Sequence, residues 1–170
     1  MLLGKTRRLV VAALMAAFAV ILVYVAVLIP TNRLFFLGGS TLALLVATVE
    51  GGLALGATTA VAAGLLVFLL LPVGPWTLAF WLFFAPYAVV RQLALRILAL
   101  GPAGWVMSWL IKLAYFNSTA YLLLALSGGR PLLSGQWLPA WALVAGGEIT
   151  FLVYDWALGY FLSYYRRRIR

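Results

Sequence analysis

A few ionisable side chains lie within long apolar stretches of this sequence, and these are the residues that could do chemistry. They are Lys112, Glu148 and Asp155, and the amide of Asn117 follows Lys112 closely along the chain. A charge at mid-bilayer costs at least ~2.5 kcal/mol, so such residues usually face the interior of a helix bundle and find partners there. We therefore expect them either to bind a ligand or to pair helices.

Two ion pairs are predicted from depth along neighbouring helices. By helical rise, Lys112 lies roughly 14 Å from one end of its helix, and Glu148 lies roughly 15 Å from the opposite end of the next. The two side chains can therefore meet near the middle. Asp155 is two turns deeper, near the level of Arg91, which predicts a second pair. Lys112–Glu148 is interpreted equally well as a functional site or as a clamp between helices, whereas a structural clamp is preferred for Arg91–Asp155.

Further polar and aromatic residues predict a pocket that faces outward. Asn117, Tyr121 and Trp141 lie in the last two apolar segments, and Arg33 lies in the first outer loop. An apolar, aromatic wall with a few convergent polar groups is typical of small-molecule sites. The other interpretation remains open, because aromatic residues near a membrane interface often only anchor a helix.

The residues that are missing exclude many kinds of enzyme. The chain has no His and no Cys, and its only acidic residues are Glu50, Glu148 and Asp155. No Ser–His–Asp triad, His- or Cys-ligated metal or carboxylate-rich metal cage can be built from them, and no glycine-rich phosphate loop occurs. We expect no catalytic activity, no metal and no cofactor, and any ATP hydrolysis has to come from a partner.

Composition indicates a helical integral membrane protein. Of 170 residues, 66% are hydrophobic and 9% are charged, whereas soluble domains are about half apolar and a quarter charged. Apolar runs near twenty residues in length favour membrane helices over a barrel. We predict one membrane domain over residues 1–170, an all-α bundle of six transmembrane helices at about 9–29, 34–50, 53–71, 76–96, 103–126 and 138–164.

The basic residues predict the orientation of these helices. The net charge of +9 is read as topological and not as a nucleic-acid surface, because the basic residues lie at helix ends. Basic residues concentrate on the cytoplasmic side of a membrane protein. With six spans, two basic residues fall on the outer side, Arg33 and Arg130, and nine fall on the side of both termini, which is therefore cytoplasmic: Lys5, Arg7, Arg8, Arg91, Arg96, Arg166, Arg167, Arg168 and Arg170.

Two segments carry small residues four positions apart, a spacing that lets helices approach closely. The segment 53–71 and the glycine before it place Gly52, Gly56, Ala60 and Gly64 in register, and packing within the chain is preferred there. The first segment has two such pairs, Ala12 with Ala16 and Ala13 with Ala17. For that segment, packing within the chain and packing against a membrane partner remain equally open.

Six short helices, cytoplasmic termini and the basic start KTRRLVVAALMAAFAVIL resemble the substrate-binding S components of energy-coupling factor (ECF) transporters. The resemblance implies a multi-pass protein of a prokaryotic-type plasma membrane that binds a vitamin-like micronutrient. It implies ligand contacts at Asn117, Tyr121 and Glu148. It also implies that Ala12, Ala13, Ala16 and Ala17 contact a transmembrane T subunit, which acts with two ATPase subunits.

Three other functions remain as alternatives. A structural scaffold, similar to the rod-shape protein D family, would recruit partners and need no pocket. A lipid or isoprenoid enzyme would have to use Lys112 and Glu148 as its acid and base. A proton-coupled carrier would use Glu148 as its relay, although the sequence lacks the internal repeat that is typical of such carriers.

Overall fold

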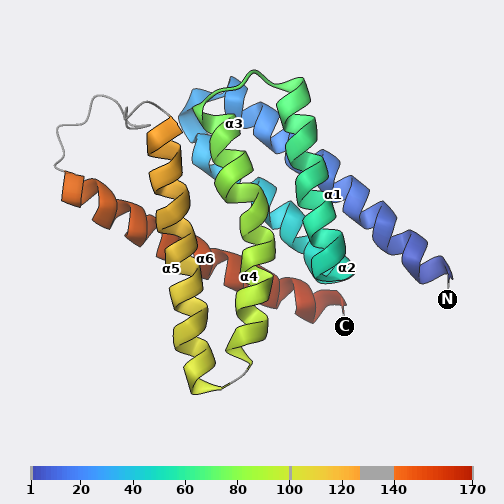
Figure 1. Ribbon diagram of the computed structural model, residues 1–170. Coiled ribbons are helices and arrows are strands. Elements are labelled where there is room, and N and C mark those ends of the chain that lie inside the picture. The colour runs from blue at the N-terminus through green and yellow to red at the C-terminus, as the bar shows by residue number, and fades with distance from the viewer. Residues whose placement is uncertain (1, 100, 127–139, 170) are drawn as a thin grey trace. The chain divides into compact units, whose positions relative to one another are not determined.

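The computed structural model describes residues 2–99, 101–126 and 140–169, and describes side-chain burial for 4–99, 101–126 and 144–167. Within these residues every regular element is helical and no strand occurs, as predicted. By its internal contacts it divides into two units, residues 1–129 and residues 130–170. The first unit holds α1 to α5 and the second holds α6 (Figure 1).

The first helix, α1, spans Leu2–Leu28. It begins before the predicted start at residue 9, because the basic residues that precede the apolar run are good helix formers and join the helix. It ends one residue before Ile29, whose extended backbone (φ −102°, ψ 106°) is the conformation favoured before a proline. Pro30 then opens the short 3₁₀ turn η1, Pro30–Asn32.

The second helix, α2, spans Arg33–Leu70 but is interrupted at Gly52, where φ is 84° and ψ is 175°. This backbone conformation is accessible essentially to glycine alone. The chain reverses direction there, so that residues 33–51 and 53–70 form two legs of a helical hairpin (Figure 1). Gly56 lies against the side chain of Thr48 across the corner, and an added Cβ would clash with that side chain.

The next helical rod is continuous but irregular. It consists of α3 (Pro75–Ala79), the π-helical turn η2 (Phe80–Phe84) and α4 (Ala85–Leu98). Pro75 occupies the first helical turn, and the Thr77 hydroxyl accepts a hydrogen bond from the Gly74 N–H at 2.8 Å. After a turn in which Gly101 has φ 102°, α5 spans Pro102–Leu126. In the second unit, α6 spans Ala140–Ile169.

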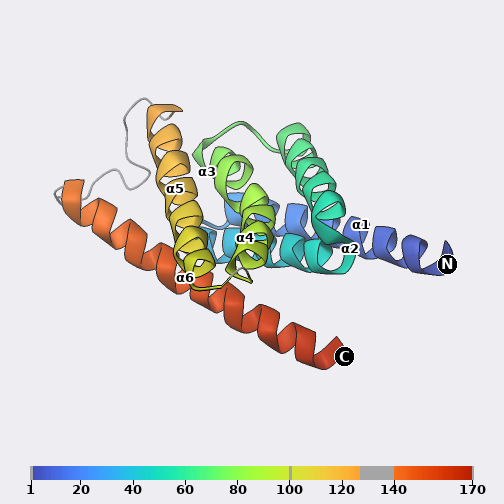
Figure 2. The same cartoon turned by 60° about the horizontal axis from the view of Figure 1, so that its bottom comes forward.

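Within the first unit, the helices pack in sequence order. α1 lies along α2, α2 packs on α4, and α4 packs on α5 (Figures 1 and 2). Small residues let α1 and α2 approach closely, since Ala19, Val23 and Ala26 are fully buried. A Cβ on Gly39 of α2 would lie 3.3 Å from the Leu22 side chain of α1. Close packing of this kind is what associates helices in lipid.

Four helical stretches in the described residues are long and apolar enough to cross a membrane: Gly4–Leu28, Pro30–Leu70, Pro75–Leu98 and Pro102–Leu126. Helix α6 is not among them, and it carries the acidic residues Glu148 and Asp155. The membrane character expected from composition is therefore compatible with the structure.

Candidate functional site

The helix that leads into α4 changes its hydrogen-bond register at η2. The N–H of Ala85 donates to the Phe80 carbonyl, five residues back, as in a π-helix. The next residue, Pro86, has no N–H to donate to the Leu82 carbonyl, four residues before it. The proline accounts for a local break in an otherwise regular rod, and turns of this kind often lie at functional sites.

Two hydroxyl groups from other helices bind the carbonyls of this turn. Tyr115 of α5 donates to the Leu82 carbonyl at 2.6 Å and to the Phe83 carbonyl at 3.3 Å. Thr41 of α2 donates to the Phe84 carbonyl at 2.9 Å. A backbone group that lacks its helical partner is costly in a bilayer unless a neighbouring side chain satisfies it. The turn is therefore braced from two sides.

Aromatic rings fill the space around the braced turn. Phe83 stacks on Tyr87 with centroids 5.3 Å apart and on Tyr115 at 6.0 Å, and it meets Phe116 edge-on at 5.8 Å. Tyr87 is fully buried. Ring pairs in these geometries contribute beyond the area that they bury. The cluster fixes α5 against η2 and α4.

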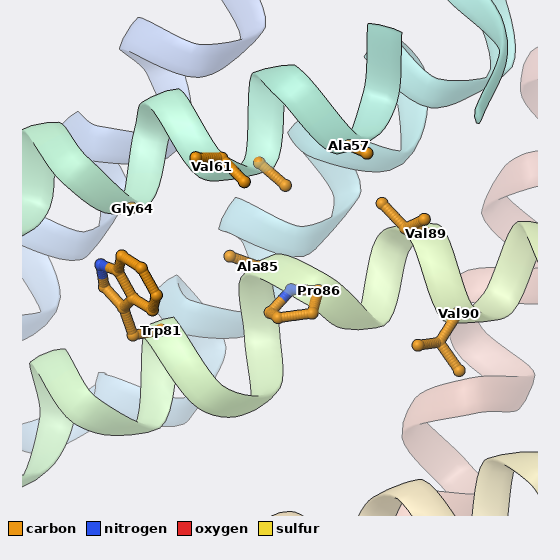
Figure 3. Close-up of a pocket in the computed structure, with 9 residues that line it drawn as sticks. Ala57, Val61, Gly64, Trp81, Ala85, Pro86, Val89 and Val90 are labelled. Carbon is orange, nitrogen blue, oxygen red and sulfur yellow. The ribbon is translucent and has the colours of Figure 1, made fainter. Parts of the chain in front are cut away.

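An apolar groove of about 230 Å³ lies beside the same turn, between the second leg of α2 and the rod η2–α4 (Figure 3). Its lining is hydrocarbon except for the indole nitrogen of Trp81, which lies within η2. The lining residues are Ala57, Ala60, Val61, Gly64, Trp81, Ala85, Pro86, Val89 and Val90. The groove thus combines a pocket with the irregular backbone next to it.

The small residues of the second leg of α2 give the groove its shape. A Cβ on Gly64 would lie 2.9 Å from Trp81 Nε1, so only glycine leaves room for the indole there. Ala60 lies one turn before Gly64 and Ala57 lies two turns before it (Ala57 in Figure 3), and their small side chains keep the groove open. Gly64 thus packs within the chain, the use preferred for this small-residue series from the sequence.

The polar residues predicted on α5 lie on two different faces. Lys112 is buried, and its Nζ lies 4.7 Å from the centre of the Trp109 ring. Asn117 is exposed and donates from Nδ2 to the Leu113 carbonyl at 3.0 Å, while Tyr121 is 76% exposed. At 100° per residue, Asn117 and Tyr121 project about 140° and 180° away from Lys112. The structure does not bring these three side chains together, and their binding of a ligand stays a prediction.

Arg33 is the first residue of α2 and is half-buried. Its guanidinium lies 5.2 Å from the centre of the Trp76 ring, close enough for a cation–π interaction. This contact holds the residue at the end of the first unit where α3 begins. Its predicted contact with a substrate stays a prediction.

The remaining predicted polar residues involve α6 of the second unit. Glu148 is half-buried and Asp155 is buried. The side chain of Trp141 lies outside the described residues. Lys112 and Arg91 belong to the first unit. The pairs Lys112–Glu148 and Arg91–Asp155 therefore join residues of different units and stay predictions.

The alanine pairs of α1 lie on two faces. Ala12 and Ala16 are buried, with exposed fractions of 5% and 7%. Ala13 and Ala17 are exposed. Only the second pair is accessible to a partner in the chain as described, and contact with a T subunit stays a prediction for all four residues.

Sequence reasoning did not find the braced turn or the groove. The signal was present in Pro86, a proline within an apolar run, since a proline frees the carbonyl four residues before it. No group of acidic residues among those described could hold a metal ion. Comparison of the chain with models of protein families, with curated proteins and with solved structures gives no match.

Proposed function

We propose that this chain is the membrane-embedded substrate-binding subunit of a micronutrient uptake transporter, similar to ECF S components. It lies in a prokaryotic-type plasma membrane with both termini in the cytoplasm. A transmembrane T subunit and two ATPase subunits supply the energy, because the sequence has no phosphate loop of its own.

One observation carries the proposal: the apolar groove lies at a proline break that two other helices brace. In transport proteins, irregular helices commonly form the binding site within the membrane. A scaffold needs neither a groove nor the hydrogen bonds that stabilise a broken helix beside it. The groove is thus the feature that favours binding over a purely structural role.

The corner in α2 supports six spans. A straight helix of 38 residues would be about 57 Å long, nearly twice the ~30 Å hydrocarbon core of a bilayer. The reversal at Gly52 divides it into two legs, each near the length of one crossing. Counting the legs separately, and α6 as the last span, gives six spans and puts both termini on one side.

The exposed face of α1 supports docking of a membrane partner. Ala13 and Ala17 lie on it, and their neighbours Leu14 and Phe18 are also exposed. Small residues flanked by large apolar ones form a shallow groove that another transmembrane helix can enter. The basic residues near the start of α1 favour a cytoplasmic position for this end of the helix, which is the side on which the proposed ATPase subunits would act.

The proposal is tested by native mass spectrometry after purification in mild detergent. We expect a retained small molecule together with T and ATPase subunits. Ala13→Trp, on the exposed face, should remove the subunits and keep the ligand. Ala62→Trp, on an exposed position of α2, is the control and should keep both. Subunits without any ligand would instead favour the scaffold, and no retained subunits would contradict the transporter.

A further inference from the structure

The groove between α2 and α4 is open on one side. Val61 and Trp81 form part of its lining and are 55% and 37% exposed. Both belong to stretches that are long and apolar enough to cross a membrane. In a chain that spans a bilayer, the open side of the groove therefore faces the hydrocarbon of the lipid.

The chemistry of the lining selects an apolar occupant. Eight of the nine lining residues have side chains without nitrogen or oxygen, so the groove cannot satisfy a charged or strongly polar group. Its volume of about 230 Å³ is below the roughly 300–1,000 Å³ of sites that enclose a drug-sized ligand. One slender hydrocarbon segment fits these limits, whereas the paired chains of a phospholipid do not.

Trp81 supplies the only hydrogen-bond donor among these side chains. It lies at one end of the row of lining residues, and Val90 lies at the other (Figure 3). An indole N–H in an apolar environment gains from meeting an acceptor. The occupant that completes the site therefore carries a carbonyl, carboxyl or ether oxygen at the Trp81 end of its chain.

We infer that the groove binds the single hydrocarbon chain of an amphiphile, which enters sideways from the bilayer and places its acceptor oxygen at Trp81. The inference gives the substrate class of the proposed transporter, and the role of the groove in uptake rests on that proposed function. The micronutrient then has a linear or isoprenoid-like tail. The groove holds the tail, and the polar part lies toward the Trp81 end.

The test uses a long-chain fatty acid with a photoactivatable diazirine in mid-chain and the purified full-length chain in detergent micelles. Cross-links, mapped by mass spectrometry, should concentrate on residues 57–64 and 81–90. Excess unlabelled fatty acid should compete, and phosphatidylcholine should not. Ala57→Leu fills the groove at a half-buried position and should reduce labelling about tenfold, which corresponds to a loss of about 1.4 kcal/mol in binding.

Two further variants make the result specific. Ala62→Leu adds the same side chain at an exposed position of α2 outside the lining and should leave labelling unchanged. Trp81→Phe should weaken labelling by the fatty acid, by about tenfold at most for one lost hydrogen bond, and should weaken labelling by a diazirine alkane clearly less. If the Ala57→Leu variant does not fold, Val89→Phe takes its place, because it fills the groove from the side of α4.

Labelling spread evenly over the lipid-facing helices, or unaffected by Ala57→Leu and Val89→Phe, would overturn the assignment. Competition by phosphatidylcholine would do the same, because it would reduce the groove to general lipid contact. The outcome is separable from that of the transporter proposal. A water-soluble ligand retained with the partner subunits would support the transporter proposal and contradict a hydrocarbon-chain site in the groove. Specific labelling of the groove without partner subunits would support the chain site and contradict the transporter proposal.

Discussion

Two helical segments of the first unit are interrupted, and the backbone at each interruption is accommodated in a different way. At Gly52, α2 turns back on itself through a backbone conformation reserved for glycine, with open space where a side chain would be. At η2, the rod continues, and hydroxyls of Tyr115 and Thr41 bind the carbonyls of the turn. A corner between two helical legs can rely on backbone freedom alone, whereas a break within a continuous apolar rod needs donors from its neighbours.

The largest effect is expected at the corner. Gly52→Ala should lower the free energy of unfolding in mixed micelles by about 2 kcal/mol, because a Cβ disfavours this backbone conformation. No steric clash contributes, since nothing lies within 4 Å of the added atom. The matched control is Gly146→Ala in α6, where space is also open and the helix is regular. Equal stability changes in the two variants would show that the corner does not depend on glycine.

The second-largest effect on stability is expected for the hydrogen bond between the Tyr115 hydroxyl and the turn η2. Tyr115→Phe keeps the stacked ring and removes the hydroxyl, so we expect a loss of about 1.5 kcal/mol from leaving a part-buried carbonyl without its donor. Pro86→Ala restores an N–H four residues after Leu82. In that background Tyr115→Phe should cost clearly less, which a double-mutant cycle measures. An undiminished cost would mean that the hydroxyl does not compensate for the proline.

The smallest effect is expected for the second hydroxyl. Thr41→Val preserves shape at a fully buried position and should cost about 0.6 kcal/mol, the mean for hydrogen bonds between membrane helices. The Phe84 carbonyl lies four residues before Ala88, whose N–H remains available in α4. A loss for Thr41→Val as large as that for Tyr115→Phe would contradict the special role of the proline.

Much of the helical layout follows from local signals in the sequence. Pro30 and the Gly51-Gly52 pair mark interruptions that the structure also has, because proline and glycine act on the backbone within a few residues. Helix α1 begins at Leu2 and not at the predicted residue 9, since apolar periodicity does not register basic residues that extend a helix. Such signals find where segments break but not what stabilises the break.

The site was much harder to predict. Tyr115 and Thr41 are separated from the carbonyls they bind by more than thirty residues, so no local pattern links them. Hydropathy also hides an apolar groove, because lining residues such as Ala57 and Val89 resemble any lipid-facing residue. The polar residues of α5 are costly in a membrane, which predicts that they converge on one site, yet Asn117 and Tyr121 lie on the opposite face of α5 from Lys112.

The corner at Gly52 also bears on biogenesis. A turn of one residue leaves no hydrophilic segment that could be threaded separately through the insertion machinery. In the six-span arrangement proposed above, the two legs of α2 leave that machinery together as a hairpin, and the direction of the first leg sets that of the second. The backbone conformation of Gly52 then couples the orientations of the two legs.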